Sequence, residues 1–209
     1  MNPSRISIEA LAVAATTFVC VAANAAILVD NLAQPTRAVT TIDAKLWAAQ
    51  SFVTDANSSL LNGVDILAGS RLGDPFQYAA LYSAGIAGPN TVLSTFSIVV
   101  GQGAVANVNL LPSMQVVLAP STAYWLVIGA SGVGSLGWAY AEGNAYIGTG
   151  SFGSYAYSSD LGVSWGTVGP ENPYQMSVQV SAVPEPETCA LLLAGLGAVG
   201  MFASLRKPA

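Results

Sequence analysis

The sequence contains no histidine and has few charged residues. Only 8% of its 209 residues are charged, and 6 Lys and Arg stand against 11 Asp and Glu. Without histidine, the chain has no Ser-His-Asp or Cys-His catalytic set and no imidazole metal site. With so few bases, it lacks the clustered positive charge that nucleic-acid binding requires. Its hydrophobic content of 53% also excludes charge-driven disorder.

A long uncharged run near the N-terminus accounts for part of the hydrophobic content. One basic residue, Arg5, precedes a run without charge over residues 10–23. Small residues at Ala23 and Ala25 fit the rule for cleavage by signal peptidase. The pattern predicts a helical signal peptide over residues 1–25. The alternative is an N-terminal membrane anchor, which an Ala-rich run diluted by Thr and Asn disfavours.

The C-terminal segment, residues 183–209, has three parts in order. A Pro-Glu-Pro motif comes first, and its prolines interrupt regular structure. Seventeen uncharged residues, 189–205, follow, at the short end of what spans a bilayer as one helix. A basic pair then acts as a membrane stop on the cytoplasmic side. The motif consists of Pro184, Glu185 and Pro186, and the basic pair of Arg206 and Lys207.

This three-part tail resembles the PEP-CTERM sorting signal of Gram-negative bacteria. The resemblance implies that exosortase, a membrane protease-transferase, recognises the motif and that the tail is removed during sorting. It also implies a membrane-anchored precursor, delivered afterwards to the cell surface or the extracellular matrix of a biofilm. The basic end is shorter here than the Arg cluster of many such tails. The alternative is an ordinary C-terminal membrane anchor, which does not account for the Pro-Glu-Pro motif.

Residues 26–182, between the two end segments, are long enough to form one domain with its own core. Three basic residues stand against eight carboxylates in this region. Cys20 and Cys189 both fall in the end segments, so the exported domain is expected to contain neither a thiol nor a disulfide. A core of this size does not need disulfides.

The pattern over residues 26–182 is that of short β-strands. Apolar or alternating runs recur between turn signals such as Asn62-Gly63 and Gly88-Pro89. No stretch has the 3.6-residue period of a long amphipathic helix. The runs are 60–67, 78–82, 92–100, 105–111, 114–118, 124–128, 136–141 and 174–180. Eight to ten strands at this spacing predict an all-β fold, a jelly-roll-like β-sandwich, flanked by the two terminal helices.

Three stretches of this region resemble, in their order, the choice-of-anchor domains of type R. They are Ala49 to Phe52, then Ala80 to Ser83 with Gly88-Pro89, and then Leu118 to Pro120 with Tyr124 to Val127. The resemblance covers roughly residues 46–180. It implies a secreted β-sandwich that carries an interchangeable surface anchor, and it implies no known catalytic activity.

Residues 158–165 match the Asp-box pattern, S-x-D-x-G-x-[S/T]-W. We expect a hairpin turn in which the Ser158 and Asp160 side chains cap turn amides. Gly162 is expected to take a left-handed conformation, with Trp165 packed beneath the turn. Sialidases carry several such boxes and three substrate-binding arginines, whereas this domain has one box and two arginines. We therefore predict a structural role for the box.

The Gly-rich region 129–169, with 11 glycines among 41 residues, also holds aromatic side chains. Aromatic rings offer flat surfaces to the C–H faces of sugars. The candidate glycan contacts are Trp138, Tyr140, Tyr155 and Tyr157. The alternative is ordinary packing within strands. Two G-x-G-x-x-G matches, 132–137 and 148–153, are interpreted as turns rather than dinucleotide sites because no helical sequence follows them.

Six carboxylates remain as candidates for a glycosidase pair or a calcium site. They are Asp55, Asp65, Asp74, Glu142, Asp160 and Glu171. A glycosidase pair is defined by a separation of about 5–10 Å in space, which sequence spacing does not give. The Asp55-Ala56-Asn57 fragment lacks the other ligands of a calcium loop. We therefore expect these carboxylates to lie at the surface, with no bound metal.

Together these patterns predict a non-enzymatic exported β protein with no cofactor. Signal peptidase and exosortase are its expected processing partners, and the C-terminal helix holds it transiently in the inner membrane. Its expected location is the cell surface or the exopolysaccharide matrix, with exopolysaccharide rather than nucleic acid as a partner. Two alternatives stay open. One is a carbohydrate-binding module that uses region 129–169, and the other is a polysaccharide hydrolase with a carboxylate pair.

Overall fold

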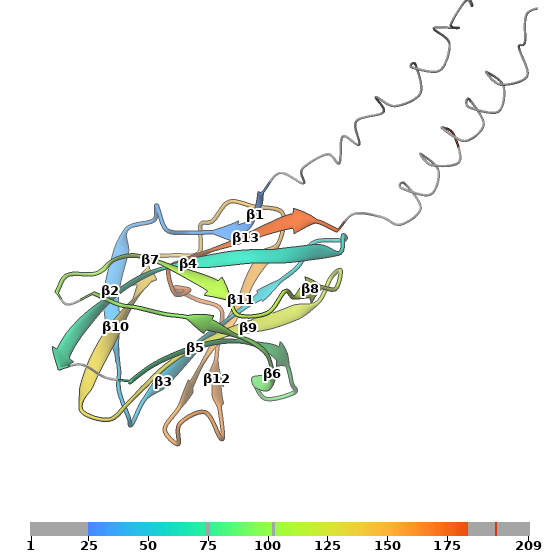
Figure 1. The fold of residues 1–209 in the computed structure, drawn as a ribbon. Coiled ribbons are helices and arrows are strands. Elements are labelled where there is room, and N and C mark those ends of the chain that lie inside the picture. Colours follow the sequence, from blue (N-terminus) through green and yellow to red (C-terminus); the bar gives the residue numbers. More distant parts are fainter. Residues whose placement is uncertain (1–24, 74–75, 102, 184–194, 196–209) are drawn as a thin grey trace, which may run out of the picture.

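The computed structural model describes residues 25–73, 76–101, 103–183 and 195. Between residues 25 and 183, the described chain forms thirteen strands and no helix (Figure 1). In chain order they are β1 (Ala26–Asp30), β2 (Thr36–Ile42), β3 (Trp47–Val53), β4 (Ser59–Gly73), β5 (Phe76–Ala84), β6 (Pro89–Ser97), β7 (Ala106–Pro112), β8 (Val117–Leu118), β9 (Ala123–Ser131), β10 (Gly134–Ala141), β11 (Ser151–Ser158), β12 (Gly166–Val168) and β13 (Met176–Ala182).

The strands form one curled antiparallel sheet. Its main path runs β1-β13-β4-β7-β6-β5-β9-β3-β11-β12, while β10 pairs with β2 and β4, and β8 pairs with β4. Strands β10 and β11 follow each other in the chain but share no ladder. We call the place where β10 and β11 face each other without backbone pairing the seam.

The last strand, β13, lies inside the sheet rather than at its edge. It pairs with β1 on one side and with β4 on the other. Ala26 lies opposite Val180, and Ala182 lies opposite Ser59. The start of β1 and the end of β13 therefore lie side by side (Figure 1). The sheet cannot be completed until residue 182 has joined it.

The all-β prediction is confirmed, and each of the eight predicted runs overlaps a strand. The pattern does not predict five further strands, β1, β2, β3, β11 and β12. Strand β3 is buried on both faces and so has no polar alternation, whereas exposed residues dominate β2 and β12.

The turn expected at Asn62-Gly63 is wrong, because both residues lie within β4. Gln179 pairs with Gly63 and Val180 with Leu61, so Asn62 is the additional residue of a β-bulge.

The helices expected at the two termini lie outside the described residues, apart from Ala25 and Gly195. In the part of the chain that the structure describes, no helix has the length and apolarity needed to cross a membrane.

The larger apolar core fills the inside of the curl. Phe52, Leu126 and Ile128 from β3 and β9 belong to it, together with Val64 and Val178 from β4 and β13. All five side chains are fully buried. The two halves of the sheet therefore enclose one core, whose burial supplies most of the driving force for folding.

A smaller apolar cluster lies on the outer face of β3, β5 and β9. It includes Trp47, Tyr82 and Trp125, and the partly buried Trp165 packs against it. Side chains alternate between the faces of a strand, so β9 contributes to both clusters, with Trp125 outside and Leu126 inside. The middle strands are consequently buried on both faces.

The Asp-box turn between β11 and β12 covers this outer cluster. Gly162 has a φ of 86°, and a Cβ there would lie 3.1 Å from the Trp47 ring. The indole Nε1–H of Trp165 donates to the Gly162 carbonyl at 3.1 Å. Beyond the turn, the Thr167 hydroxyl donates to the Ala87 carbonyl at 2.6 Å, which fastens β12 to the turn between β5 and β6.

Hydrogen bonds to Asp160 organise the Asp-box turn. Its carboxylate accepts the Ser164 hydroxyl at 2.5 Å, the Ser158 hydroxyl at 2.7 Å and the Ser164 backbone N–H at 2.9 Å. The Ser158 Oγ in turn accepts the Gly162 N–H at 2.8 Å. The two hydroxyls and the backbone N–H of Ser164 lower the pKa of Asp160 to about 2, because each donor favours the ionised carboxylate.

We predict that Gly129→Ala destabilises the sheet. A methyl group at Gly129 in β9 would overlap the Trp47 ring, which is held in place by a 2.8 Å hydrogen bond from Nε1–H to the Ala130 carbonyl. Overpacking of this kind costs about 1–3 kcal/mol of unfolding free energy, to be measured by urea denaturation. The control is Gly169→Ala, where nothing lies within 4 Å of the added Cβ. Equal losses for the two variants would contradict the prediction.

The Asp-box turn is predicted to loosen in acid. The folded-state pKa of Asp160 is about 2, below the usual value near 4. The stabilisation is therefore fully present above about pH 4 and is lost as the pH falls toward about 2. The indole N–H resonance of Trp165, followed by NMR from pH 5 to 2, should report the change. Asp160→Asn should melt at a lower temperature at pH 7 and should show less change in melting temperature between pH 4 and pH 2. An identical pH dependence in both proteins would refute this assignment.

Candidate functional site

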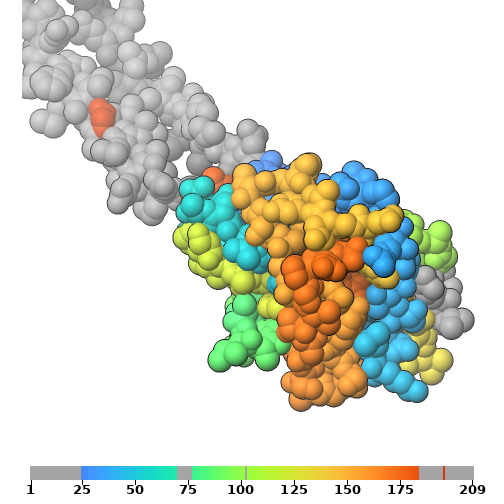
Figure 2. Space-filling model, turned by 180° about the vertical axis from the view of Figure 1, so that it is seen from behind, coloured from blue at the N-terminus to red at the C-terminus, as the bar shows by residue number. Residues whose placement is uncertain are grey.

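Three of the four aromatic residues expected as glycan contacts line one pocket at the seam. Tyr140 comes from β10, and Tyr155 and Tyr157 come from β11. The pocket has a volume of about 190 Å³, and Arg37, Asn172 and Tyr174 complete its lining. Figure 2 shows this face of the molecule, where β2 in blue lies beside residues 135–150 in gold and residues 151–175 in orange. We call this the tyrosine pocket.

The rings of the tyrosine pocket form a floor with upright walls. Tyr174, only 2% exposed, is the floor. The rings of Tyr140 and Tyr155 meet it at 78° and 87°, each with a centroid distance of 6.1 Å. Tyr157 meets Tyr155 at 70° and 5.5 Å. Edge-to-face contacts of this kind are favourable and hold the rings in fixed directions.

The hydroxyl groups in the pocket divide into bonded and unbonded ones. The Tyr174 hydroxyl lies 2.7 Å from the Thr40 Oγ1 and 3.1 Å from the Tyr157 hydroxyl. Within the described residues, the hydroxyls of Tyr140 and Tyr155 have no hydrogen-bond partner, so they are available to a ligand. Burial raises the pKa of Tyr174 and of Tyr155 above the ordinary value, so both hydroxyls stay protonated around neutral pH.

Two polar residues form the rim of the tyrosine pocket. Asn172, with a φ of 53°, accepts the Gly143 N–H at 3.0 Å and Arg37 Nη1–H at 3.4 Å through its side-chain oxygen. Its own backbone N–H donates to the Asn144 side-chain oxygen at 2.8 Å. Sequence reasoning missed Arg37, Asn172 and Tyr174 as site residues, because they join the pocket only through long-range pairing.

The segment that carries the pocket floor is held by two buried side-chain amides on either side of it. The Gln50 Oε1 accepts the Tyr174 N–H at 2.9 Å, while its Nε2 donates to the Gly153 carbonyl at 2.9 Å. Asn31 accepts the Met176 N–H at 2.8 Å and donates to the Tyr174 carbonyl at 3.2 Å. The floor is therefore fixed before any ligand arrives.

A third buried amide, Gln175, lies in the same segment. Its Oε1 accepts the Thr36 hydroxyl at 2.6 Å, and its Nε2 donates to the Gln34 carbonyl at 2.8 Å. These bonds tie the segment to Gln34 and to the first residue of β2, the strand that carries Arg37. The rim and the floor of the pocket are thereby positioned relative to each other.

The structure corrects the expectation for Trp138. Its side chain is completely buried, its ring stacks on Tyr174 at 4.3 Å, and its Nε1–H donates to the Gln175 carbonyl at 3.1 Å. Because no part of Trp138 reaches solvent, it cannot contact a glycan directly. It supports the pocket floor from behind.

None of the candidate carboxylates that the structure describes lines the tyrosine pocket. Asp65 accepts hydrogen bonds from the Asn109 and Gln179 side chains, and Asp55 accepts the Thr149 hydroxyl and the Asn57 backbone N–H. Glu142 and Glu171 are exposed, Asp160 lies in the Asp-box turn, and Asp74 lies outside the described residues. No group of three or more metal-ligating side chains occurs among the described residues.

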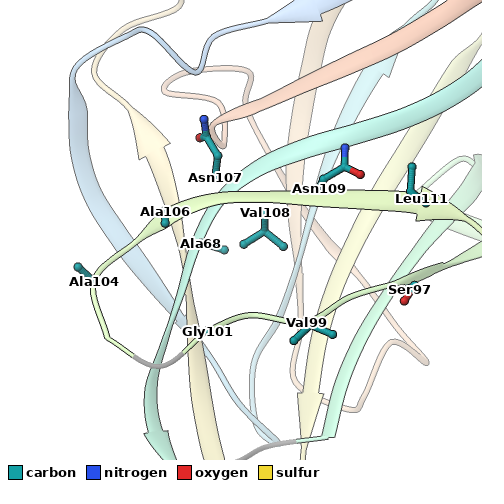
Figure 3. Close-up of a pocket in the computed structure, with 10 residues that line it drawn as sticks. All are labelled: Ala68, Ser97, Val99, Gly101, Ala104, Ala106, Asn107, Val108, Asn109 and Leu111. Carbon is teal, nitrogen blue, oxygen red and sulfur yellow. The ribbon is translucent and has the colours of Figure 1, made fainter.

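A second pocket, of about 400 Å³, lies beneath β7 (Figure 3). Val108 points from β7 toward the segment that carries Val99 and Gly101, whereas Asn107 and Asn109 project from the other side of β7. Among the residues that the structure describes, no charged or aromatic side chain lines this pocket. It offers few groups that could orient a ligand, so the tyrosine pocket is the better candidate site.

Most of the predicted processing residues lie outside the described residues. These are Ala23, Pro184, Glu185, Pro186, Arg206 and Lys207. Ala25 is described and exposed, immediately before β1. The last described residue before the Pro-Glu-Pro motif is Val183, one residue beyond the end of β13.

Comparison with known proteins identifies the C-terminal tail. No curated protein sequence matches the chain. Residues 182–207 match the family model described as the PEP-CTERM protein-sorting motif. The motif indicates an exported protein whose membrane-anchored precursor is processed by exosortase. The chain therefore carries a PEP-CTERM sorting motif that begins at the last residue of β13.

Proposed function

We propose that this protein is a non-enzymatic polysaccharide-binding protein of the cell surface or exopolysaccharide matrix of a Gram-negative bacterium. Signal peptidase removes residues 1–25, exosortase removes the tail, and the β domain between them reaches the surface. The sorting motif supports the route. The tyrosine pocket is the single observation that carries the binding role.

The tyrosine pocket has the chemistry that sugar binding requires. Sugars present apolar C–H faces and polar edges, and the pocket offers aromatic rings together with hydroxyl, amide and guanidinium groups. Its edge-to-face ring contacts and the buried amides under its floor fix these groups in advance. A preformed site of this kind spends little binding free energy on ordering side chains.

The hydrolase alternative has less support than binding does. Catalysis by a glycosidase needs two carboxyl groups that face one groove. In the described part of the chain, neither the tyrosine pocket nor the pocket beneath β7 is lined by an Asp or Glu side chain. We therefore place the proposed function in binding rather than in bond cleavage.

We also propose that the curled sheet is a jelly-roll-like sandwich related to the choice-of-anchor domains of type R. The support for this is one core enclosed between two halves of the sheet, with β13 closing it directly before the tail.

The sorting motif is predicted to be required for removal of the tail. In a Gram-negative host with an active exosortase, mass spectrometry of the exported protein should show loss of the segment after β13. Glu185→Ala should remain full length in the membrane fraction. Glu187→Ala, outside the Pro-Glu-Pro motif, serves as the control and should be processed normally. A wild-type chain that stays full length at the inner membrane would contradict the sorting route.

The tyrosine pocket is predicted to bind polysaccharide through Tyr155. Truncation of an aromatic side chain at the centre of a binding site typically removes more than 1–2 kcal/mol, so Tyr155→Ala should weaken binding about tenfold or more. The measurement is affinity electrophoresis or calorimetry against a panel of β-glucan, xylan, mannan, alginate and polygalacturonate. Tyr146→Ala removes a similar ring, which is 40% exposed outside the pocket, and is the control. Thermal melting checks that both variants are folded. Unchanged affinity in folded Tyr155→Ala would refute the assignment.

A further inference from the structure

Among the side chains that the structure describes, Arg37 is the one cation that lines the tyrosine pocket. The region 26–182 has only three basic residues, and Lys45, the other one whose side chain the structure describes, does not line it. This region carries a net charge of −5, from three bases and eight carboxylates. Because basic residues are rare in this acidic domain, the presence of one at the aromatic pocket suggests a specific role there.

The Arg37 guanidinium has donors to spare. It is exposed on β2, and its Nη1–H donates to the Asn172 side-chain oxygen at 3.4 Å. In the described part of the chain it forms no ion pair with a carboxylate. A guanidinium carries five N–H donors in a planar fork, which matches the two oxygens of a carboxylate. Most of the N–H donors of Arg37 therefore have no partner among the described residues.

We infer that the tyrosine pocket takes an anionic sugar unit, a uronate of an acidic polysaccharide, with its carboxylate on Arg37. This inference rests on the proposed binding function and names its substrate class. The sugar ring lies against the tyrosine walls, and the carboxylate accepts hydrogen bonds from the guanidinium. Hydrogen bonds between ionised partners are roughly twice as strong as neutral ones, so this contact provides selectivity among otherwise similar sugars.

Two exposed carboxylates near the pocket oppose the bound anion. Glu171 directly precedes Asn172 in the chain, and Glu142 directly precedes Gly143, which donates to Asn172. Burial is the main cause of the raised pKa of Tyr155, and the charge of Glu171 contributes to it, so the field of Glu171 reaches the pocket. Neither glutamate lines the pocket. Removing the charge of Glu171 should therefore strengthen the binding of an acidic polysaccharide.

The experiment compares polygalacturonate and alginate with their carboxyl-reduced forms, using the exported protein. The wild type should bind the acidic forms about tenfold more tightly at low salt. This preference should shrink as the ionic strength rises. Arg37→Gln should lose the preference while still binding the carboxyl-reduced forms, and Glu171→Gln should increase it. Lys45→Gln removes an exposed cation from the 43–46 turn, outside the pocket, and should leave the preference unchanged.

The outcomes separate this inference from the proposed function. Equal or tighter binding of the carboxyl-reduced forms overturns the inference and leaves polysaccharide binding intact. Binding of neither form overturns the proposed function. A dextran sulfate arm tests the anion itself, since equally tight binding of the sulfate polymer would show general attraction to anions rather than recognition of a carboxylate. An equal loss of preference in Lys45→Gln would likewise overturn the role of Arg37.

Discussion

Three buried side-chain amides hold the segment 173–176. Both the floor of the tyrosine pocket and the strand that leads into the sorting motif depend on the position of this segment. Asn31, Gln50 and Gln175 are each at most 1% exposed. Their donors and acceptors meet backbone groups and one hydroxyl around the segment. A buried polar group that loses its partner costs about 1–3 kcal/mol, so displacing the segment would leave several such groups unpaired at once. The segment therefore has one well-defined position.

The position of the segment matters for two neighbouring features, the tyrosine pocket and the sorting tail. Tyr174 lies in the segment and forms the floor of the tyrosine pocket, and β13 begins two residues later. The sorting motif begins at the end of β13. Because Tyr174 is only two residues before β13, and β13 pairs with both β1 and β4, the pocket floor is anchored directly to the strand that precedes the tail. The tyrosine pocket, the proposed binding site, therefore has its floor directly before the strand that leads into the sorting motif.

Sequence patterns predicted strands with clear alternation, such as β13, and continuously apolar runs, such as the middle of β9, but missed β2 and β3. Strand β13 alternates and was predicted, whereas β3 is buried on both faces and β2 is largely exposed. The Asn62-Gly63 pair is a turn by local preference, but pairing on both sides of β4 makes it a bulge. The turn preference of these two residues is overruled because the neighbouring strands pair with the backbone of β4 on both sides.

The candidate site was predictable only in part for the same reason. Tyr140, Tyr155 and Tyr157 lie in one Gly-rich region and could be grouped from the sequence. Arg37 and Asn172 are 135 positions apart and meet only because the curled sheet brings β2 beside the start of the segment 173–176. Trp138 shares the region but faces the core, because its ring and its N–H are both satisfied there.

The seam explains why tyrosine, rather than another aromatic residue, gathers at this place. Strands β10 and β11 share no ladder, so side chains must close the gap between them. Purely apolar rings would close the seam as core, and charged side chains would leave it open to water. Tyrosine packs through its ring and presents a hydroxyl at the surface, so it closes the seam and leaves a polar, partly open pocket. The tyrosines of the proposed binding site thus also pack across the seam, and a ligand bound there should stabilise these contacts.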